Sequence, residues 1–371
     1  MKLRRIFCLV PDCHSSSGHY NTLWRNHFEL GVAGVVERVV FPVGLHFDWA
    51  RSDFPQLSEN LVSRARAEQS EKLRAQIFAA HSEHGLDAVL SYCYGRDVEQ
   101  GLVTECISRG IPWINFFCDS THQFEHVETI ARVASLNWFP EHAATRTYQA
   151  LGRKFVCLPY AVNPDFMPDC TTERAERSAA FIGLPTTNRV QQLGILLWLG
   201  IPLEIRGRGW DARTQFHNPV PKWRRLAQIA RAGNFGEKLL RRAVWKRVES
   251  AFRGPLPDAE LQSYLRKTRV LLGLNQGRDR SGVYESYLKF RDIEFPGYGC
   301  CYVTQANADT TRLFARDEEI VLYDGIWDAH KKIDLLLRNP DRAKEIGKRA
   351  RQRVLREHTW QRRIAQLAEA L

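Results

Sequence analysis

Cationic and carboxylate side chains gather in one short stretch, "KFRDIEFPGYGCCYVT", which runs from Lys289 to Thr304. Its second half reads as a buried strand entered through two glycines, and glycine lets a backbone approach a ligand or another element closely. Charged groups beside such an approach often belong to a ligand site, although a solvated helix face is the simpler explanation. The residues at the other strand ends help to distinguish a ligand site from a solvated helix face.

Similar polar residues follow or precede several other apolar runs of the second half of the chain. They are Arg189, Arg208, Asn275, Gly277, Arg278, Lys289, Arg291 and Glu294. In an open parallel sheet the strand exits lie at one edge, where ligands bind. A helix expected to begin near Arg189 would add free N–H groups and a positive dipole that suit phosphate. The chain contains neither GxGxxG nor GxxxxGK[ST], so a dinucleotide fingerprint and a P-loop are excluded.

Two loops of the first half carry groups that could act on an acceptor. "PDCHSSSGHY" follows the first apolar run, and "FFCDSTHQFE" follows a later one and contains Asp119 and His122. A histidine and an aspartate at a strand exit can position or deprotonate a hydroxyl. The alternative for Asp119 and Ser120 is a helix N-cap. For His14 and His19 a plain surface role is equally compatible.

The elements that must position these groups follow from the alternation of short apolar runs with helix-patterned segments. This alternation predicts parallel sheets covered by helices, and it restarts after a Pro-punctuated connection at residues 158–168. We therefore expect two tandem, doubly wound α/β domains, 1–165 and 166–354, with an interdomain cleft. The chain ends in helices from Asn339-Pro340 onward, and we expect residues 355–371 to pack back on the first domain.

Composition indicates an ordinary globular protein of 371 residues, 44% of them apolar and 26% charged. Its nine cysteines include no CxxC pair, which favours reduced, mostly buried thiols in a cytoplasmic protein over disulfides or zinc. The N-terminal apolar run is too short for a signal peptide, and no run reaches the length of a membrane span.

The formal charge of +11 is concentrated in one place. Residues 212–253 contain eleven Lys and Arg against two Glu, interleaved with Trp223 and Trp245. This basic, apparently helical insertion suits an anionic membrane surface, a polyanion, or a solvated hairpin packed on its own domain. No nucleic-acid module accompanies it, so nucleic acid is not expected as a partner.

Several segments resemble one known family. "GRGW", "LPDAELQSYLRKTRVLLGLN", "RDIEFPGYGCCYVTQ" and the run from "DEEIVLYDGIW" to "TWQRRI" are similar to the C-terminal half of CgeB-like, spore-maturation-type glycosyltransferases. The resemblance covers roughly residues 179–364, and the first half agrees in layout only. That family is similar to the retaining family-4 enzymes, so the resemblance implies the GT-B fold.

The resemblance also implies an activity. It is the transfer of a sugar, with retention, from a UDP- or GDP-linked donor to a glycan, lipid-linked or protein acceptor, as in polysaccharide biosynthesis. The competing interpretation is a non-catalytic GT-B protein that binds a partner or an anionic membrane through its basic insertion. Epimerisation and phosphorolysis, which the GT-B fold also supports, are not what the resemblance points to.

Donor-binding residues can be carried over from the related family-4 enzymes. Their ribose-binding glutamate precedes a glycine pattern, as Glu294 does here, and their diphosphate-binding basic residue corresponds to Arg189. Their second glutamate, eight positions earlier, is Ser286 in this chain, with Glu285 adjacent. Arg291 is the candidate to replace that glutamate, or else to hold Glu294 in place.

Family-4 relatives often carry an active-site histidine after the strand that corresponds to "INFF", which favours Asp119 and His122 as the acceptor-side pair. The donor phosphate itself can take the proton in a retaining reaction, so neither residue need be a base. Glycosyltransferases of the GT-A fold hold a metal ion at the diphosphate through an Asp-x-Asp motif, and this chain contains none. Arginine and a helix N-terminus must then stabilise the departing diphosphate. We therefore expect no metal cofactor.

Overall fold

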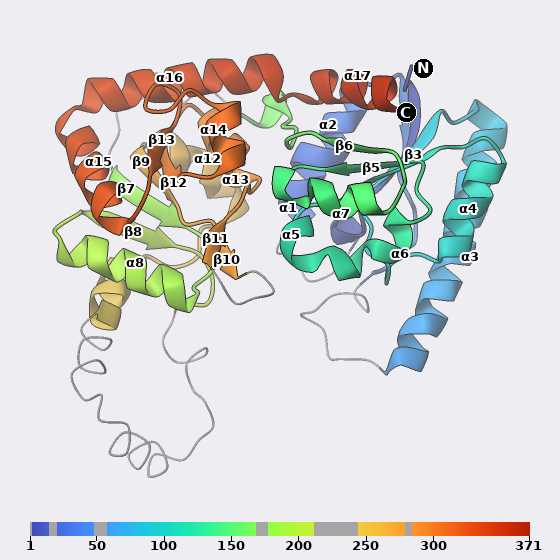
Figure 1. Cartoon of the computed structure of the whole chain (residues 1–371), viewed down its shortest axis with the longest axis horizontal. Coiled ribbons are helices and arrows are strands. Elements are labelled where there is room, and N and C mark those ends of the chain that lie inside the picture. The colour runs from blue at the N-terminus through green and yellow to red at the C-terminus, as the bar shows by residue number, and fades with distance from the viewer. Residues whose placement is uncertain (1, 15–20, 48–57, 168–176, 211–243, 279–283) are drawn as a thin grey trace, which may run out of the picture. The chain divides into compact units, whose positions relative to one another are not determined.

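The structure is a computed structural model of the whole chain (Figure 1). It describes all residues except 1, 15–20, 48–57, 168–176, 211–243 and 279–283. The chain forms two compact units, each built from separate segments. Unit 1 comprises Met1–Met167, Gln276–Ile293 and Val354–Leu371, and unit 2 comprises Pro168–Asn275 and Glu294–Arg353. Residues 276–293, which we placed in the C-terminal domain, therefore lie in unit 1.

A six-stranded parallel sheet in the order β2-β1-β3-β4-β5-β6 forms the centre of unit 1. Its strands are β1 (Arg5–Leu9), β2 (Arg38–Val40), β3 (Ala88–Ser91), β4 (Trp113–Phe116), β5 (Leu136–Phe139) and β6 (Phe155–Cys157). Every residue of β3, β4 and β5 is buried, as expected for strands covered on both faces.

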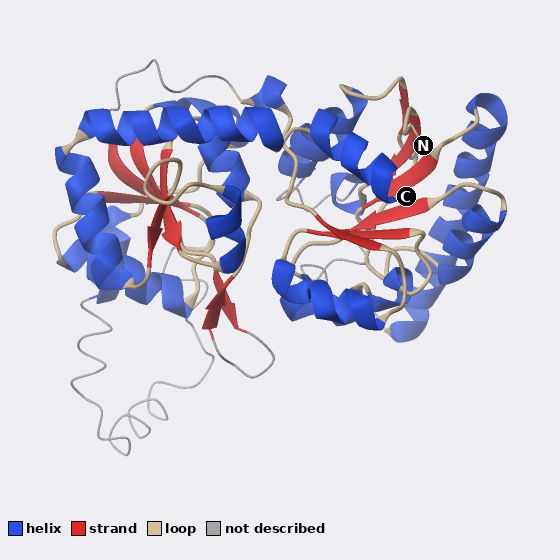
Figure 2. Ribbon diagram, turned by 45° about the horizontal axis from the view of Figure 1, so that its top comes forward, coloured by secondary structure: helices blue, strands red, loops and turns tan. Residues whose placement is uncertain are grey.

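Helices cover both faces of each sheet (Figure 2). Those of unit 1 are α1 (Asn21–Trp24), α2 (Leu30–Ala33), α3 (Glu59–His84), α4 (Gln100–Ser108), α5 (Ser120–Gln123), α6 (Glu128–Ala131), α7 (Thr145–Ala150) and α17 (Trp360–Ala370). A π-helical turn, Arg25–Glu29, joins α1 to α2, and 3-10 turns cover Pro11–His14, Phe124–His126, His142–Ala144 and Pro164–Phe166.

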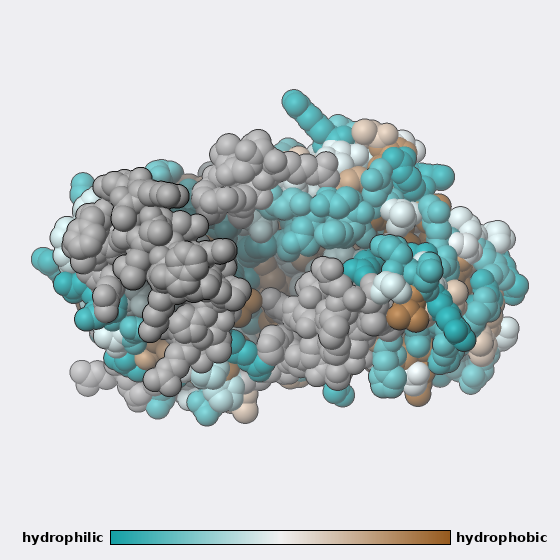
Figure 3. Space-filling view, turned by 90° about the horizontal axis from the view of Figure 1, so that it is seen from below, coloured by the Kyte–Doolittle hydropathy of each residue, from teal (hydrophilic) through white to brown (hydrophobic). Residues whose placement is uncertain are grey.

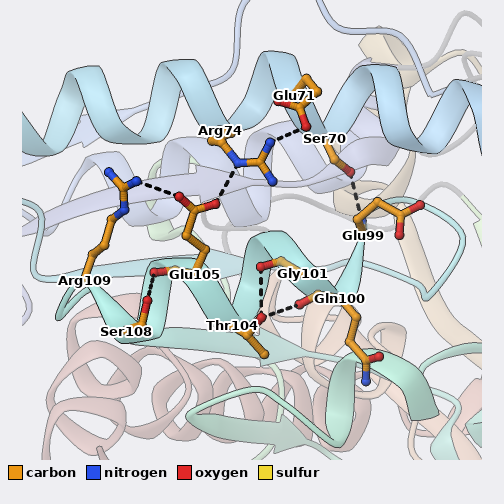
Figure 4. Close-up of polar contacts among 10 residues, drawn as sticks. All are labelled: Ser70, Glu71, Arg74, Glu99, Gln100, Gly101, Thr104, Glu105, Ser108 and Arg109. Atoms are coloured by element: carbon orange, nitrogen blue, oxygen red, sulfur yellow. Dashed lines mark hydrogen bonds and ion pairs between the residues drawn. The ribbon is translucent and has the colours of Figure 1, made fainter.

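Charged side chains fix α3 against α4 on the outside of unit 1 (Figure 4). Nε of Arg74 in α3 donates to Glu105 in α4 at 2.8 Å, and Arg109 pairs with the same carboxylate at 2.7 Å. The backbone N–H of Glu99 donates to Ser70 Oγ at the start of α4. These contacts fix the helix that leads directly into β4, whose exit carries Asp119.

Unit 2 is a five-stranded parallel sheet in the order β13-β12-β9-β7-β8. Its strands are β7 (Arg177–Ile182), β8 (Leu203–Arg206), β9 (Thr268–Gly273), β12 (Cys301–Gln305) and β13 (Val321–Tyr323). Its helices are α8 (Thr187–Trp198), α12 (Asp258–Arg266), α13 (Arg291–Gly297), α14 (Ala308–Leu313), α15 (Ile326–Arg338) and α16 (Pro340–Glu357). The first residues of α13 belong to unit 1, as do the last residues of α16.

All eleven parallel strands lie on apolar runs that the sequence marks as strands, and two doubly wound α/β domains are confirmed. A short antiparallel pair, β10 (Gln276–Arg278) with β11 (Tyr284–Ser286), was not predicted. Its residues are mostly polar and show no alternation that would mark a strand.

The C-terminal helix α17 packs against α2 and β6. The fully buried Trp360 donates its indole N–H to the carbonyl of His27 and packs edge-on against Phe28, with ring centroids 4.7 Å apart. Gly31 in α2 makes this approach possible, because a Cβ there would lie 2.2 Å from Trp360 Cδ1.

The predicted basic insertion, 212–253, lies largely outside the described residues. Its last part, residues 244–251, is helical, and Val248 and Ala251 are buried in the core of unit 2. Gly194 of α8 lies directly against this helix, since a Cβ on Gly194 would meet Val244 Cγ1 at 2.1 Å. Residues 244–251 are therefore part of the domain rather than an appendage.

The described cysteines form no disulfide, and six of them are buried: Cys8, Cys93, Cys106, Cys118, Cys300 and Cys301. Cys13 and Cys157 are partly exposed, and Cys170 lies outside the described residues. Burial raises the pKa of the Cys8 and Cys118 thiols well above its usual value, which keeps them protonated and unreactive.

No helix in the described part of the chain is both long enough and apolar enough to cross a bilayer. The face seen in Figure 3 is mostly hydrophilic where its residues are described, with small apolar patches between polar side chains.

Candidate functional site

Arg189 lies at the topological switch point of unit 2, where strand order reverses between β7 and β9. Its backbone N–H donates to Thr186 Oγ1, the N-cap of α8, at 3.2 Å. Its guanidinium donates from Nε to the carbonyl of Leu274 at 3.0 Å and from Nη1 to that of Leu184 at 2.9 Å. One arginine thus bridges the loops after β7 and β9, beside a helix N-terminus, where phosphates bind in folds of this kind.

Asn275 lies just beyond β9, after Leu274, and is fully buried. Its Nδ2 donates to Tyr302 Oη at 3.1 Å and lies 3.5 Å from Thr304 Oγ1, both in β12. The side chain is therefore fixed by the neighbouring strand at the same edge of the sheet as Arg189.

Arg208 and Arg278 are placed differently from Arg189. Arg208 is exposed after β8, between Gly207 and Gly209, which adopt φ values of +134° and +77°. The adjacent Trp210 is buried and donates to the carbonyl of Gly183 at 2.7 Å, which fixes this loop to the exit of β7. Arg278 lies in β10 within unit 1, and its side chain lies outside the described residues.

Helix α13 carries both Arg291 and Glu294. Arg291 is its first residue and is half-buried in unit 1, whereas Glu294 is its fourth residue and is 5% exposed in unit 2. Glu294 therefore lies inside the helix rather than at its start.

The glycines after Glu294 have a structural explanation. Gly299 lies in the turn that follows α13 and has a φ of +83°, a left-handed conformation that glycine adopts without strain. A Cβ on Gly347 of α16 would lie 2.1 Å from the carbonyl oxygen of Gly299, and Arg351 of α16 donates to the carbonyl of Gly297 at 2.5 Å. The glycine pattern thus allows α16 to pack closely on the end of α13.

Asp119 is the centre of a second polar cluster, in unit 1 at the exit of β4. It adopts a left-handed conformation with a φ of +63°, and its carboxylate pairs with Lys289 Nζ at 2.5 Å. It occupies the N-cap position of α5 but makes no capping hydrogen bond through its side chain. Its backbone N–H donates instead to the carboxyl group of Glu141.

Glu141 follows β5, the strand beside β4, and none of its surface is exposed. Burial, reinforced by the nearby Asp119 carboxylate and opposed by Lys289, raises the pKa of Glu141 from 4.5 to about 8. Oε2 of this carboxyl group has no hydrogen-bond partner in the described part of the chain. Glu141 is thus a buried acid that keeps its proton at neutral pH.

Tyr287 and His122 complete the cluster. Lys289 Nζ lies 4.0 Å from the centroid of the Tyr287 ring, and the His122 ring packs edge-on against the same tyrosine at 4.3 Å. Burial alone would lower the pKa of Lys289, but the Asp119 carboxylate and Tyr287 raise it above its ordinary value. The lysine therefore stays charged, and the side chains of both members of the ion pair are 25% exposed.

The predicted pair Asp119 and His122 is thus brought together, although its role stays a prediction. Glu141 was missed, yet it had the same signal as Asp119, since each is an acid just beyond an apolar run that forms a buried strand. The contact of Lys289 and Tyr287 with this loop had no local signal, because 170 positions separate Lys289 from Asp119.

Among the described residues no group of three or more His, Cys, Asp or Glu side chains is arranged to hold a metal ion.

Comparison with known proteins identifies the fold. Residues 191–369 match the model of a family described as glycosyl transferase-like. No curated protein matches the chain at a significant level.

Three solved structures resemble the whole chain. Sucrose-phosphate synthase from Thermosynechococcus elongatus is 14% identical, with a TM-score of 0.60 over 99% of this chain and 98% of the synthase. A glycosyltransferase from Rickettsia africae is 11% identical, with a TM-score of 0.58 over 99% of this chain and 97% of its own. HepE from Anabaena in complex with UDP is 11% identical, with a TM-score of 0.55 over 99% of this chain and 100% of HepE. The expected GT-B fold of tandem Rossmann-like domains is confirmed.

Proposed function

We propose that this protein is a glycosyltransferase that moves a sugar from a nucleoside diphosphate sugar, UDP- or GDP-linked, to an acceptor hydroxyl. The observation that carries the proposal is the match of residues 191–369 to a glycosyl transferase-like family. The similar HepE structures, in complex with UDP and with UDP-glucose, support a nucleotide sugar as the donor.

In this proposal the donor binds unit 2. Arg189 and the N-terminus of α8 hold the diphosphate, because a guanidinium and backbone N–H groups offer fixed positive charge where the leaving group gains negative charge. Glu294 holds the ribose, and Arg291 contacts the transferred sugar in place of the second family-4 glutamate. Arg208 and Asn275 complete the donor side in unit 2, and Arg278 and Arg291, which belong to unit 1, stay predicted donor residues.

The finer points of the proposal follow the resemblance to CgeB-like enzymes. Transfer proceeds with retention and without a metal ion, and the acceptor is a glycan, a lipid-linked sugar or a protein in polysaccharide biosynthesis. Asp119 and His122 contact the acceptor, and the protein works in the cytoplasm.

Thermal unfolding with added nucleotides tests the donor site. We expect millimolar UDP or GDP to raise the melting temperature of the full chain, because a ligand that binds only the folded state stabilises it. Glu294→Gln and Arg189→Gln should each remove most of that shift. If UDP, GDP, CDP and ADP all leave the melting temperature unchanged, the proposed activity is wrong and a non-catalytic GT-B protein becomes the better explanation.

A matched control separates nucleotide binding from general damage to unit 2. Glu319 is another largely buried glutamate of unit 2, and it pairs with Arg353 at 3.0 Å. Glu319→Gln should lower the melting temperature of the unliganded protein while it retains the nucleotide-dependent shift.

We further propose peripheral contact with anionic membranes through residues 212–243, which contain eight Lys and Arg against one Glu. Co-sedimentation with phosphatidylglycerol vesicles at low and high salt is the test. A deletion of 212–243 keeps residues 244–251, which the core of unit 2 requires. Salt-sensitive binding should disappear in this variant, whereas equal partitioning of both proteins would exclude the segment as the anchor.

A further inference from the structure

The Asp119–Lys289 pair offers a donor and an acceptor side by side to solvent. Asp119 Oδ1 accepts from Lys289 Nζ, and no residue in the described part of the chain donates to Oδ2. An ammonium group has three N–H donors. Asp119 Oδ1 accepts one of them, and the ammonium group also faces the Tyr287 ring, 4.0 Å from its centroid. Asp119 Oδ2 and at least one N–H of Lys289 therefore remain for a ligand, at a pair whose two side chains are each 25% exposed.

The surroundings hold this pair in place. Glu141 accepts from the backbone N–H of Asp119, which fixes Asp119 in its left-handed conformation. Tyr287 packs against the ammonium group of Lys289, and Phe290, the next residue of that segment, packs against Trp24 with ring centroids 5.6 Å apart. A preorganised pair loses little entropy when it binds a ligand.

The charges at the site select the ligand. Asp119 and Lys289 neutralise each other. Among the described residues, two further carboxyl groups contact them, both fully buried and both through backbone N–H groups: Glu141 accepts from Asp119 and Asp292 accepts from Lys289. An anionic ligand that paired with Lys289 would also lie against the Asp119 carboxylate, and a cationic one would lie against the ammonium group. Neighbouring hydroxyl groups of a neutral polyol fit both, since one can donate to Asp119 Oδ2 while the other accepts from Lys289.

We propose that Asp119 and Lys289, positioned by Glu141 and Tyr287, form a binding site for two neighbouring hydroxyl groups of a neutral sugar. That this sugar is the acceptor rests on the proposed function, whereas the site itself does not. Lys289 is thus a specificity-determining residue, because it neutralises the Asp119 carboxylate and offers the ligand an N–H donor of its own.

Saturation-transfer NMR with two matched probes tests the site. Methyl β-D-glucopyranoside and methyl β-D-glucuronide differ only in a hydroxymethyl and a carboxylate group. The full-length protein should bind the neutral glucoside and discriminate against the glucuronide. Lys289→Met should weaken binding of the glucoside by about tenfold or more, because a charge-assisted hydrogen bond is lost.

Asp119→Asn gives a sharper result. Asparagine tolerates the left-handed conformation, so the backbone at this position should be kept. Without the Asp119 carboxylate the charge of Lys289 is uncompensated, and the preference should reverse in favour of the glucuronide.

The ion pair between Lys332 and Asp328 of α15 is the matched control, with a separation of 3.2 Å and side-chain exposures of 23% and 37%. Lys332→Met and Asp328→Asn should leave glucoside binding unchanged. The proposal is overturned if neither probe binds the wild-type protein at high millimolar concentration, if the glucuronide is preferred, or if the Asp119 and Lys289 variants behave like the wild type.

The outcome is separable from that of the proposed function. A nucleotide-dependent thermal shift without glucoside binding would contradict the sugar site alone. Glucoside binding without any nucleotide shift would contradict the transferase and leave the sugar site standing.

Discussion

Glu141 makes the stability of unit 1 depend on pH. The pKa of its carboxyl group rises from 4.5 in the unfolded chain to about 8 in the fold, where burial and Asp119 disfavour the charged form. Between these values the folded state binds one more proton than the unfolded state. The contribution of Glu141 is thus complete below about pH 4.5 and is lost progressively as pH rises through about 8.

Glu141→Gln should remove this dependence, since the amide cannot ionise but can still accept from Asp119 N–H. Between about pH 4.5 and 8 the free energy of unfolding of the wild type should fall by on the order of 4 kcal/mol more than that of the variant. Denaturant unfolding at several pH values measures the difference.

Glu59→Gln, at an exposed position in the first turn of α3, is the control and should keep the wild-type slope. An equal slope in Glu141→Gln would show that another group takes up the proton.

Two residues, Arg189 and Glu141, show how far single positions can be predicted from sequence. Arg189 was predicted because a strand, a loop and a helix start are local patterns, and the structure places it in the first turn of α8, while its role stays a prediction. Glu141 lies closer to a strand end, just beyond β5, but its importance depends on complete burial beside Asp119, which no local pattern reports.

At the scale of elements, Gly31 in α2 is a test of packing. Gly31→Ala places a methyl group 2.2 Å from Trp360, which is fully buried and cannot move aside. Overpacking of this kind costs about 1–3 kcal/mol, more than the roughly 1 kcal/mol that alanine gains over glycine in a helix. We expect a net loss of stability in thermal or denaturant unfolding.

Gly101→Ala in α4 is the matched substitution, because a Cβ there meets nothing within 4 Å. It should be neutral or slightly stabilising. If the Gly31 and Gly101 variants are equally stable, the contact between α2 and Trp360 is looser than the structure shows.

The parallel strands could be predicted because each lies on a short apolar run, and β3, β4 and β5 are buried at every residue. The β10–β11 pair could not, since "QGRDRSGVYES" contains neither such a run nor a regular alternation. The strands of the two sheets are therefore predictable from their apolar runs, whereas a short polar strand pair depends on the surrounding fold.

At the scale of the whole molecule, sequence reasoning divides the chain into consecutive domains, but the structure does not follow that order. Residues 276–293 join unit 1, where Lys289 reaches Asp119 across 170 positions and Phe290 packs on Trp24. Contacts between positions so distant in the chain produce no local sequence pattern from which they could be predicted.

The six buried thiols in the described part of the chain can report how often each unit opens. Cys8, Cys93, Cys106 and Cys118 lie in unit 1, and Cys300 and Cys301 lie in unit 2. A thiol reagent can modify such a group only when its surroundings open, so modification rates measured by mass spectrometry would follow the opening of each unit separately. Ligands could then be assigned to a unit by the thiols whose labelling they slow, without introducing any probe into the chain.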